Sequence, residues 1–320
     1  MLFSIIIANY NKADNISALL SSIYDTYPHN DFEVFFMDDA SSDASLDAAR
    51  KFPVRLHAGN ANIGPAALRN MAARNACGDF LLFIDSDVIL PTGVLTNFRN
   101  LCLSRKFAAV YGLEVLPPVI DNWIGNFRTL QIQDQWGKYR EQEAYVRSWG
   151  TTFGAIRRDL FYSIGGFNES YRGADVEDHE LVARIDGKQI ILYTPQLTYR
   201  HTYTGTSELM IKQFRRASSM VKIKQKYIVS NSFYGLRFAL SHLFTVITVA
   251  GIAACFYDRR WTFAVICALL LKASFHRYLL YRALAMKGMA FAFYCYVANL
   301  LMSFCVISGG LYGTLSRIRK

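Results

Sequence analysis

Two aspartates separated by one residue, Asp85 and Asp87, close an apolar stretch at residues 80–84. Residues along a strand alternate between its two faces, so a strand that continues through Asp87 points both carboxylates the same way. Hard oxygen ligands placed together in this manner suit a divalent cation that carries a diphosphate. An isolated Asp-x-Asp pair is also typical of a solvated strand end or of a helix N-cap, so the rest of the sequence has to decide between these interpretations.

Apolar segments alternate with amphipathic segments through the first third of the chain, which predicts an α/β domain with a mostly parallel sheet. No G-x-G-x-x-G motif follows the first predicted strand and the sequence contains no P-loop, which disfavours a dinucleotide dehydrogenase. The predicted strands are residues 3–8, 32–37, 54–57, 80–84 and 108–114, and the predicted helices are residues 16–24, 45–52, 66–75 and 92–105.

Polar clusters follow four of these predicted strands at their carboxyl ends, at residues 9–11, 38–43, 60–64 and 85–87. In open α/β sheets the ligand lies beyond the carboxyl ends of the strands, so we expect the four clusters to meet in one crevice. Residues 115–148 are aromatic and polar without a clear period, and we interpret them as a loop-rich acceptor region.

Charge is divided unevenly along the chain. Residues 1–207 carry 19 Lys and Arg against 23 Asp and Glu, whereas residues 208–320 carry 16 Lys and Arg against two acids. A basic tail is typical of nucleic-acid or anionic-lipid binding, but this tail also contains uncharged runs at residues 238–257 and 288–316 that are long enough to span a membrane. We therefore expect anionic membrane lipids, and not nucleic acid, as its partner.

The sequence predicts an integral cell-membrane protein with a cytoplasmic catalytic domain. The amino terminus has no basic region and its apolar run is too short for a signal peptide. Seven Lys and Arg between residues 212 and 237 precede the first apolar run, as the positive-inside rule requires. The six cysteines show no metal-type spacing and agree with a reducing compartment.

Three regions follow from this reasoning: residues 1–207 as the catalytic domain, 208–235 as a basic amphipathic helix on an anionic leaflet, and 236–320 as a transmembrane region. Residues 261–275 are interpreted either as a short return span or as an interfacial segment, which leaves two or three spans.

Seven sequence elements occur in an order that resembles the family-2 glycosyltransferases of GT-A fold, and the resemblance covers about residues 2–225. The opening at residues 5–11 is similar to V-I-P-x-Y-N, with Ala8 in the place of the usual proline. In the second element Ala40 stands where glycine is frequent. The matching elements are residues 5–11, 38–43, 62–64 with 68–70, 85–87, 165–169, 177–181 and 199–201.

The resemblance implies that Asp39 accepts a hydrogen bond from the nucleotide base and that Arg69 faces the base or the diphosphate. A carboxylate facing an N–H of uracil is a directional contact that cytosine cannot supply at that atom, so UDP is the favoured donor nucleotide. The residues implied in donor binding are Ala8, Asn9, Asn11, Asp38, Asp39, Asn62, Gly64, Arg69, Asp85, Ser86, Thr151 and Thr152.

The resemblance further implies that Asp85 and Asp87 hold Mg²⁺ or Mn²⁺, with His201 either as a further ligand or as a structural residue. Displacement at an anomeric carbon by a hydroxyl needs a carboxylate that removes the proton. The pair Glu177 and Asp178 supplies that carboxylate, with Asp178 at the family's catalytic position, and the expected outcome is inversion in one step. Alternatively, these acids only stabilise the first turn of a helix.

Gln213, Arg215 and Arg216 resemble part of the Q-x-x-R-W signature of processive synthases, but Ala217 occupies the tryptophan position. We therefore expect transfer of a single sugar, with these residues contacting either the acceptor or the membrane surface. The expected acceptor is a hydroxyl of a lipid-linked saccharide or glycolipid. The alternatives are a polyprenyl phosphate, whose oxygen needs no base, and a nucleotide-binding membrane scaffold without turnover.

Overall fold

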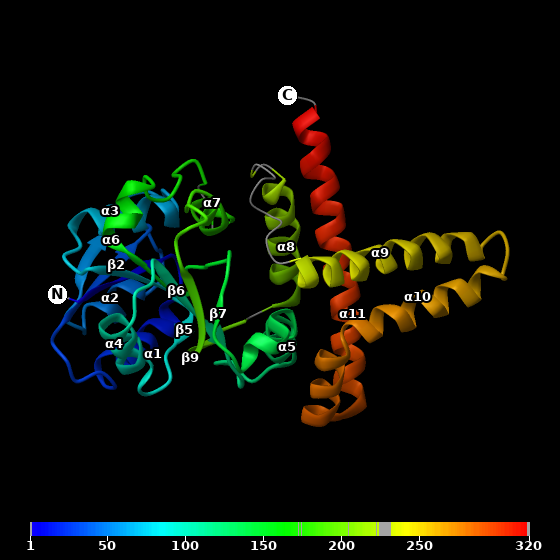
Figure 1. Cartoon of the computed structure of the whole chain (residues 1–320), viewed down its shortest axis with the longest axis horizontal. Helices are drawn as coiled ribbons and strands as arrows, with labels where there is room; N and C mark the ends of the chain where they lie inside the picture. The colour runs from blue at the N-terminus through cyan, green and yellow to red at the C-terminus, as the bar shows by residue number, and fades with distance from the viewer. Residues whose placement is uncertain are drawn as a thin grey trace. The chain divides into compact units, whose positions relative to one another are not determined.

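The computed structural model of the chain describes residues 2–171, 173, 175–203, 205–221, 223 and 232–318. The chain divides into two units (Figure 1). Unit 1 comprises Met1–Ile120 and Lys138–Thr202, and unit 2 comprises Asp121–Gly137 and Tyr203–Lys320. The predicted boundary at residue 207 lies close to the start of the last segment of unit 2 at Tyr203, but residues 121–137 belong to unit 2 and not to unit 1.

Unit 1 contains a nine-stranded sheet in the order β3-β2-β1-β4-β8-β6-β9-β5, with β7 paired to β9. The half formed by β3, β2, β1 and β4 is parallel, as predicted. The strands β6 and β9 are also parallel to each other, whereas β8 runs antiparallel to β4 and β6, and β5 and β7 run antiparallel to β9, so the sheet is mixed. The strands are β1 (Phe3–Asn9), β2 (Phe32–Asp38), β3 (Arg55–Ala58), β4 (Phe80–Asp85), β5 (Val88–Ile89), β6 (Ala109–Glu114), β7 (Ala144–Tyr145), β8 (Phe153–Arg157) and β9 (Ile191–His201).

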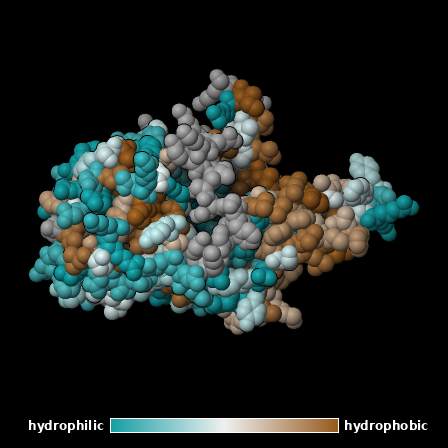
Figure 2. Space-filling view, viewed as in Figure 1, coloured by the Kyte–Doolittle hydropathy of each residue, from teal (hydrophilic) through white to brown (hydrophobic). Residues whose placement is uncertain are grey.

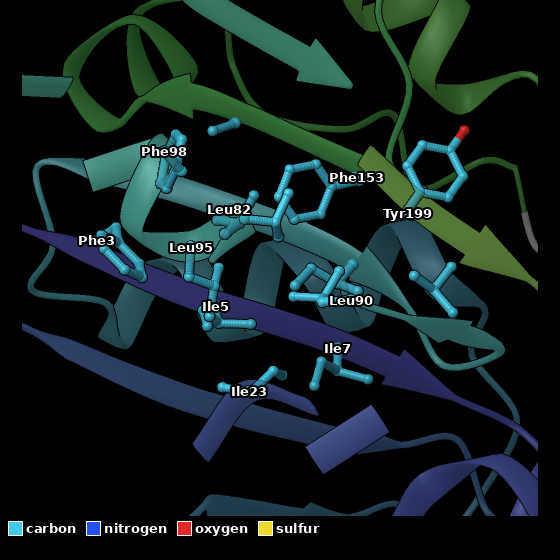
Figure 3. Packing of buried hydrophobic residues seen from close by; sticks show 14 of the residues in the cluster. Phe3, Ile5, Ile7, Ile23, Leu82, Leu90, Leu95, Phe98, Phe153 and Tyr199 are labelled. Atoms are coloured by element: carbon cyan, nitrogen blue, oxygen red, sulfur yellow. The ribbon is translucent and has the colours of Figure 1, made fainter. Parts of the chain in front are cut away.

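The core of unit 1 lies between the central strands and the helices that cover them. Phe3, Ile5 and Ile7 of β1 pack with Leu82 of β4 and with Phe98 of α4 (Figure 3). These five side chains are fully buried, and burying each stabilises the fold by about 1.5–3 kcal/mol. The helices of unit 1 are α1 (Ala13–Tyr24), α2 (Ser45–Ala49), α3 (Pro65–Asn75), α4 (Val94–Ser104), α6 (Arg158–Ser163) and α7 (Glu177–Ala183).

The strand β4 ends at Asp85 and does not continue through Asp87, contrary to the premise drawn from the sequence. Ser86 and Asp87 form a turn into β5, which pairs with β9 and with no neighbour of β4. The two carboxylates are therefore brought together by a change of pairing partner and not by alternation along one strand.

Unit 2 is helical and consists of α5 (Trp123–Trp136), α8 (Thr206–Met220), α9 (Ser232–Cys255), α10 (Trp261–Phe275) and α11 (Arg277–Ile318), while a short 3-10 helix at Gly137–Arg140 follows α5. The helix α5 corrects the interpretation of residues 115–148 as a loop-rich region. In α11 the backbone leaves the helical region at Lys287 and Gly288, where Gly288 has a φ of +77°.

Two helices of unit 2 are long and apolar enough to cross a membrane by length and composition, α9 over Leu236–Cys255 and α11. The helices α9 and α10 lie side by side (Figure 1), and Figure 2 shows hydrophobic side chains over this pair with a hydrophilic end at the turn that joins them. With 15 residues, α10 is shorter than the roughly 20 that a span needs.

The predicted amphipathic helix begins near the expected residue but packs differently. Gly309 and Gly313 of α11 approach α8 so closely that a Cβ on either would clash with the backbone oxygens of Phe214 and Ser218. The apolar face that contains Phe214 therefore packs on α11 and does not lie open for a leaflet. Lys222, Lys224 and Lys226, which were expected to contact the leaflet, lie outside the described residues.

Candidate active site

The carboxyl ends of β1, β2 and β4 lie at one edge of the sheet of unit 1. The strand register pairs Ala8 with Asp85 and Asn9 with Asp38, so the polar residues that end these strands are neighbours. The structure thereby brings together three of the four clusters expected from the sequence, and the loop that follows β3 joins them through Asp39, as described below.

Asp85, Asp87 and His201 each offer a ligand atom, and these atoms lie within 4.8 Å of one another. The last residue of β9, His201, is opposite Val88 in the register between β5 and β9, which places its Nε2 3.3 Å from Oδ1 of Asp87. Its Nδ1 lies 2.7 Å from the carbonyl oxygen of Thr202. Because a carbonyl only accepts, Nδ1 carries the hydrogen, and a neutral ring then turns the lone pair of Nε2 toward the aspartates.

Two cations lie beside these carboxylates. Lys12 Nζ is 3.4 Å from Oδ2 of Asp87, and Arg69 Nη2 is 2.8 Å from Oδ1 of Asp85. Sequence reasoning did not single out Lys12, although it directly follows the polar cluster at residues 9–11. The two cations offset part of the charge repulsion between Asp85 and Asp87.

Arg69, which the resemblance places toward the base or the diphosphate, lies 4% exposed between two acids. Its Nη1 donates to Oε1 of Glu177 at 2.8 Å, in addition to the contact of Nη2 with Asp85. Burial raises the pKa of Glu177, and the positive charge of Arg69 opposes that rise. The ion pair with Arg69 thus favours the charged carboxylate.

Asp39 holds the loop between β3 and α3. Its Oδ1 accepts from the backbone N–H of Ile63 at 2.7 Å, and its Oδ2 accepts from that of Gly64 at 2.9 Å. Gly64 has a φ of +90°, a conformation that disfavours any side chain, and Asn62 is exposed beside it. These contacts fix the loop at the edge of the sheet where the nucleotide base was expected.

Asp38 and Asn9 form a buried hydrogen-bonded pair next to that loop. Asp38 is 0% exposed, and its Oδ1 accepts from Nδ2 of Asn9 at 2.8 Å and from Oγ of Ser41 at 2.6 Å. Ser41 also accepts from the backbone N–H of Asn11 at 2.9 Å. Ser41 was not among the residues expected, yet it joins the ends of β1 and β2.

Two residues that are not glycine adopt left-handed backbone conformations in this region, Asn11 with a φ of 51° and Ala40 with a φ of 60°. Asparagine tolerates this conformation, and its Oδ1 accepts from the backbone N–H of Ser42 at 2.8 Å. Alanine carries a Cβ without any such compensation. Glycine, which the resemblance gives as frequent at this place, would adopt the conformation without that cost.

The segment that precedes β8 runs between Asp85 and Asp178. The backbone N–H of Asp85 donates to the carbonyl of Thr152 at 3.3 Å. At Gly150, a Cβ would lie 3.5 Å from Oδ2 of Asp178. Thr151, between them, is buried at 5% exposure, while Asp178 is partly exposed. The expected donor-sugar segment therefore lies next to both the aspartate of β4 and the expected base.

Asn70 connects two of the sequence elements that matched the family. Its Nδ2 donates to the carbonyl of Phe167 at 2.8 Å, and its Oδ1 accepts from the backbone N–H of Phe167 at 2.9 Å. Gly166 has a φ of +67°, and a Cβ there would lie 2.8 Å from Oδ1 of Asn70. The family match at residues 68–70 included Asn70, but it did not indicate Phe167 as its partner.

Ser86 is buried at 6% exposure in the turn after β4, and Ala8 is partly exposed at the end of β1. Gln213, Arg215 and Arg216 lie on α8 of unit 2, where Arg215 is exposed and the other two are partly buried.

Residues 4–156 match the family described as glycosyl transferase family 2. Glycosyltransferase AglE of Haloferax volcanii is 32% identical over 231 residues, which cover 69% of this chain and 73% of that protein. An uncharacterized glycosyltransferase of Haemophilus influenzae is 25% identical over 71% of this chain and 77% of that protein. Poly(ribitol-phosphate) beta-N-acetylglucosaminyltransferase TarS of Staphylococcus aureus is 37% identical over 93 residues, and this match covers 16% of its length.

Two solved structures share the fold. Mannosyltransferase PcManGT from Pyrobaculum calidifontis, in complex with GDP-Man and Mn²⁺, aligns with a TM-score of 0.60 and 18% identity over 98% of this chain and 87% of that one. TarS 1–349 of S. aureus in complex with UDP aligns with a TM-score of 0.50 and 17% identity over 96% of this chain and 91% of that one. The chain belongs to glycosyl transferase family 2 and is a glycosyltransferase.

Proposed function

We propose that this glycosyltransferase moves a single sugar from a UDP-sugar to a hydroxyl of a lipid-linked saccharide or glycolipid, with inversion and with the help of a divalent metal. The observation that carries the proposal is the convergence of Asp85, Asp87 and His201 within 4.8 Å at the edge of the sheet that also presents Asp39. A metal-ligand set beside a base-binding loop is the arrangement that a nucleotide diphosphate requires.

The residues at the edge of the sheet fit a divalent metal. Two carboxylates provide the hard oxygen ligands that Mg²⁺ and Mn²⁺ prefer, and the imidazole of His201 adds a nitrogen ligand that favours a transition metal. Asp85, Asp87 and His201 would hold the ion, which when bound would take up the charge that develops on the departing diphosphate. The neighbour PcManGT is described in complex with Mn²⁺, which supports the same type of metal here.

Lys12 would bind the diphosphate beside this site. Its ammonium lies 3.4 Å from Asp87 and is about one third exposed. A metal on Asp87 would weaken that ion pair, and a donor phosphate would then offer Lys12 a replacement anion. Asp39 and the loop at residues 62–64 would bind the base.

Asp178 would remove the proton from the acceptor hydroxyl. It is partly exposed and lies beside Gly150, next to the segment that leads to Thr151 and Thr152. A carboxylate on the side of the sugar opposite the leaving group gives inversion by direct displacement. The UDP complex of TarS 1–349, which has the same fold, supports UDP as the donor nucleotide.

A lipid-linked acceptor is supported by unit 2. Two of its helices are long and apolar enough to cross a membrane, and exposed hydrophobic side chains such as Leu243, Ile252 and Phe263 cover α9 and α10 (Figure 2). A catalytic unit anchored at the cytoplasmic face would meet an acceptor that is confined to the same membrane.

The experiment uses the full chain in membranes, a panel of UDP-sugars and an extracted lipid pool, with transfer measured in Mn²⁺ and in EDTA. Asp87→Ala should abolish transfer while the protein stays folded, because Asp87 lies in a turn and contributes little to the core. The matched control is Asp159→Asn, which removes an exposed acid paired with Arg157 and should leave transfer unchanged. Full activity of the unmodified protein in EDTA would contradict the metal assignment.

A further inference from the structure

Arg69 joins three parts of unit 1 that are far apart in the sequence. The residue lies on α3, and its guanidinium contacts Asp85 at the end of β4 and Glu177 at the start of α7, with both N···O distances equal to 2.8 Å. Glu177 is 108 residues away from Arg69 in the chain. The next residue after Glu177 is Asp178, the proposed base. Arg69 therefore connects α7, which carries this base, with β4, which ends at the proposed metal ligand Asp85.

The surroundings of this bridge, formed by Asp85, Arg69 and Glu177, restrict the movement of its side chains. The side chains of Arg69 and Glu177 are each 5% exposed, and the guanidinium lies over the ring of Phe167 at 5.7 Å. The second oxygen of Glu177 accepts from the backbone N–H of Asp175 at 2.9 Å. Both carboxylate oxygens of Glu177 are therefore engaged by donors of the protein, whereas Asp178 is partly exposed beside Gly150.

We propose that Glu177 and Arg69 are positioning residues that fix the helix of Asp178 to the strand end of Asp85, and that Glu177 accepts no proton in the reaction. The inference rests on the proposed function, because it assigns the base to Asp178 and the metal to Asp85. It gives different roles to Glu177 and Asp178, which the sequence analysis considered together as a pair.

The same contacts set the charge at the metal ligands. Asp85, Asp87 and Glu177 are three carboxylates, and among the residues that the structure describes they contact the cations Lys12 and Arg69. Glu177 offsets part of the positive charge of Arg69. Arg69 therefore competes less strongly with a divalent cation for Asp85. Without Glu177 the full guanidinium charge would be directed at Asp85, and metal binding would weaken.

The test compares Glu177→Gln with Asp178→Asn in the full chain. We expect Glu177→Gln to raise the Kd for Mn²⁺, titrated without nucleotide, by about 10-fold, at the lower end of the range of about 10–100-fold for residues that orient metal ligands. At saturating Mn²⁺ its kcat should stay within about tenfold of the unmodified protein, whereas loss of a general base costs about 10²–10⁴-fold. An unchanged Mn²⁺ affinity with a kcat reduced more than a hundredfold would make Glu177 the base and overturn the proposal.

Two further variants keep the test decisive. Glu180→Gln removes a charge from the same helix, where Glu180 pairs with Arg184 and not with Arg69, and it should leave the Kd for Mn²⁺ nearly unchanged. The double variant Arg69→Gln/Glu177→Gln removes both members of the more buried pair of the bridge, so its loss of unfolding temperature should be smaller than the sum of the losses in the two single variants. If the losses of unfolding temperature in the two single variants add up in the double variant, this double-mutant cycle would show that Arg69 and Glu177 do not act together.

The cycle also separates this inference from the proposed function. The unfolding temperatures of these variants measure the coupling between Arg69 and Glu177, and this measurement needs no metal, nucleotide or turnover. A protein that binds no Mn²⁺ would refute the metal assignment, while a coupled pair in the cycle would still support the bridge.

Discussion

Asp178 and Glu177 are adjacent in the sequence but lie in different surroundings, which is the basis for the different roles proposed for them. Glu177 is 4% exposed and bonded to Arg69, whereas Asp178 is partly exposed and its Oδ1 accepts from the backbone N–H of His179 at 2.8 Å. A proton acceptor has to reach the acceptor hydroxyl, so exposure beside Gly150 favours Asp178.

Asp178→Asn keeps the shape of the side chain and removes its basicity. If the acceptor is a sugar hydroxyl, kcat should fall by about 10²–10⁴-fold with UDP affinity nearly unchanged. If the acceptor is a polyprenyl phosphate, no proton has to be removed and the loss should be less than about tenfold. The measurement is turnover with UDP affinity determined in parallel, and a small loss with intact affinity would reject the base assignment.

Ala40→Gly tests the left-handed conformation between β2 and α2. A Cβ in this conformation costs roughly 1–2 kcal/mol, and glycine loses roughly 0.5–1 kcal/mol through the entropy of the unfolded chain. We therefore expect a net gain of up to about 1 kcal/mol in unfolding free energy, measured by denaturant titration. The control Ala67→Gly lies inside α3 and should lose about 1 kcal/mol. Equal losses in both variants would contradict strain at Ala40.

At the residue scale, the sequence indicated most of the acids at the strand ends because Asp38, Asp39, Asp85 and Asp87 directly follow apolar runs. It did not indicate Lys12, and it placed Ser41 in the polar cluster at residues 38–43 without a role of its own, since neither residue type carries a distinctive pattern. The roles of Arg69 and Glu177 depend on a contact across 108 positions, which no local spacing reveals.

At the element scale, predicted and observed structure agree where neighbouring strands are joined by helices. The alternation of apolar and amphipathic segments predicted β1 to β4 and the helices between them, because each element buries one face against the next. Of the later strands, β8 runs antiparallel to β4 and β6, whereas β9 is parallel to β6, and these partners are set by contacts between distant segments. The proximity of His201 to Asp87 depends on one such contact, between β5 and β9.

The helix α5 shows a second limit of sequence patterns. Polar side chains on it are buried, among them Asn126, Gln131, Gln133 and Asp134. A helix that buries polar residues as well as apolar ones has no clean apolar stripe, so its sequence lacks the period that would identify it. Asp134 and Gln133 contact Arg237 and Tyr278 on other helices of unit 2, whereas the partners of Asn126 and Gln131 lie directly before α5 or within it.

At the scale of the whole molecule, the chain passes between the two units three times, after Ile120, Gly137 and Thr202. Unit 2 therefore includes α5 from the middle of the sequence and is not simply a carboxyl-terminal tail. The predicted division at residue 207 would separate α5 from the helices that hold it.

Asp134 is the residue of α5 on which this connection depends most. It is 0% exposed, its two oxygens lie 2.7 and 2.8 Å from Nη2 of Arg237 on α9, and Nδ1 of His276 lies 2.9 Å from its Oδ2. Nε2 of His276 is within hydrogen-bond distance of Oγ of Ser241. Nζ of Lys272 contacts Oγ of Ser241 and Oγ of Ser303 at 3.0 and 2.9 Å. Four helices are thus joined by one buried polar network.

Asp134→Ala should reduce the unfolding free energy of unit 2 by about 3–5 kcal/mol, because it leaves Arg237 buried without its acid. Asp121→Asn is the matched control, since Asp121 is 64% exposed and its ion pair with Lys287 is worth at most about 1 kcal/mol. Both variants are made in the full chain, solubilised in detergent, and compared by thermal unfolding and by proteolysis within residues 121–137. Equal stability of the two variants would mean that the network does not hold α5, and that residues 121–137 fold without the carboxyl-terminal helices.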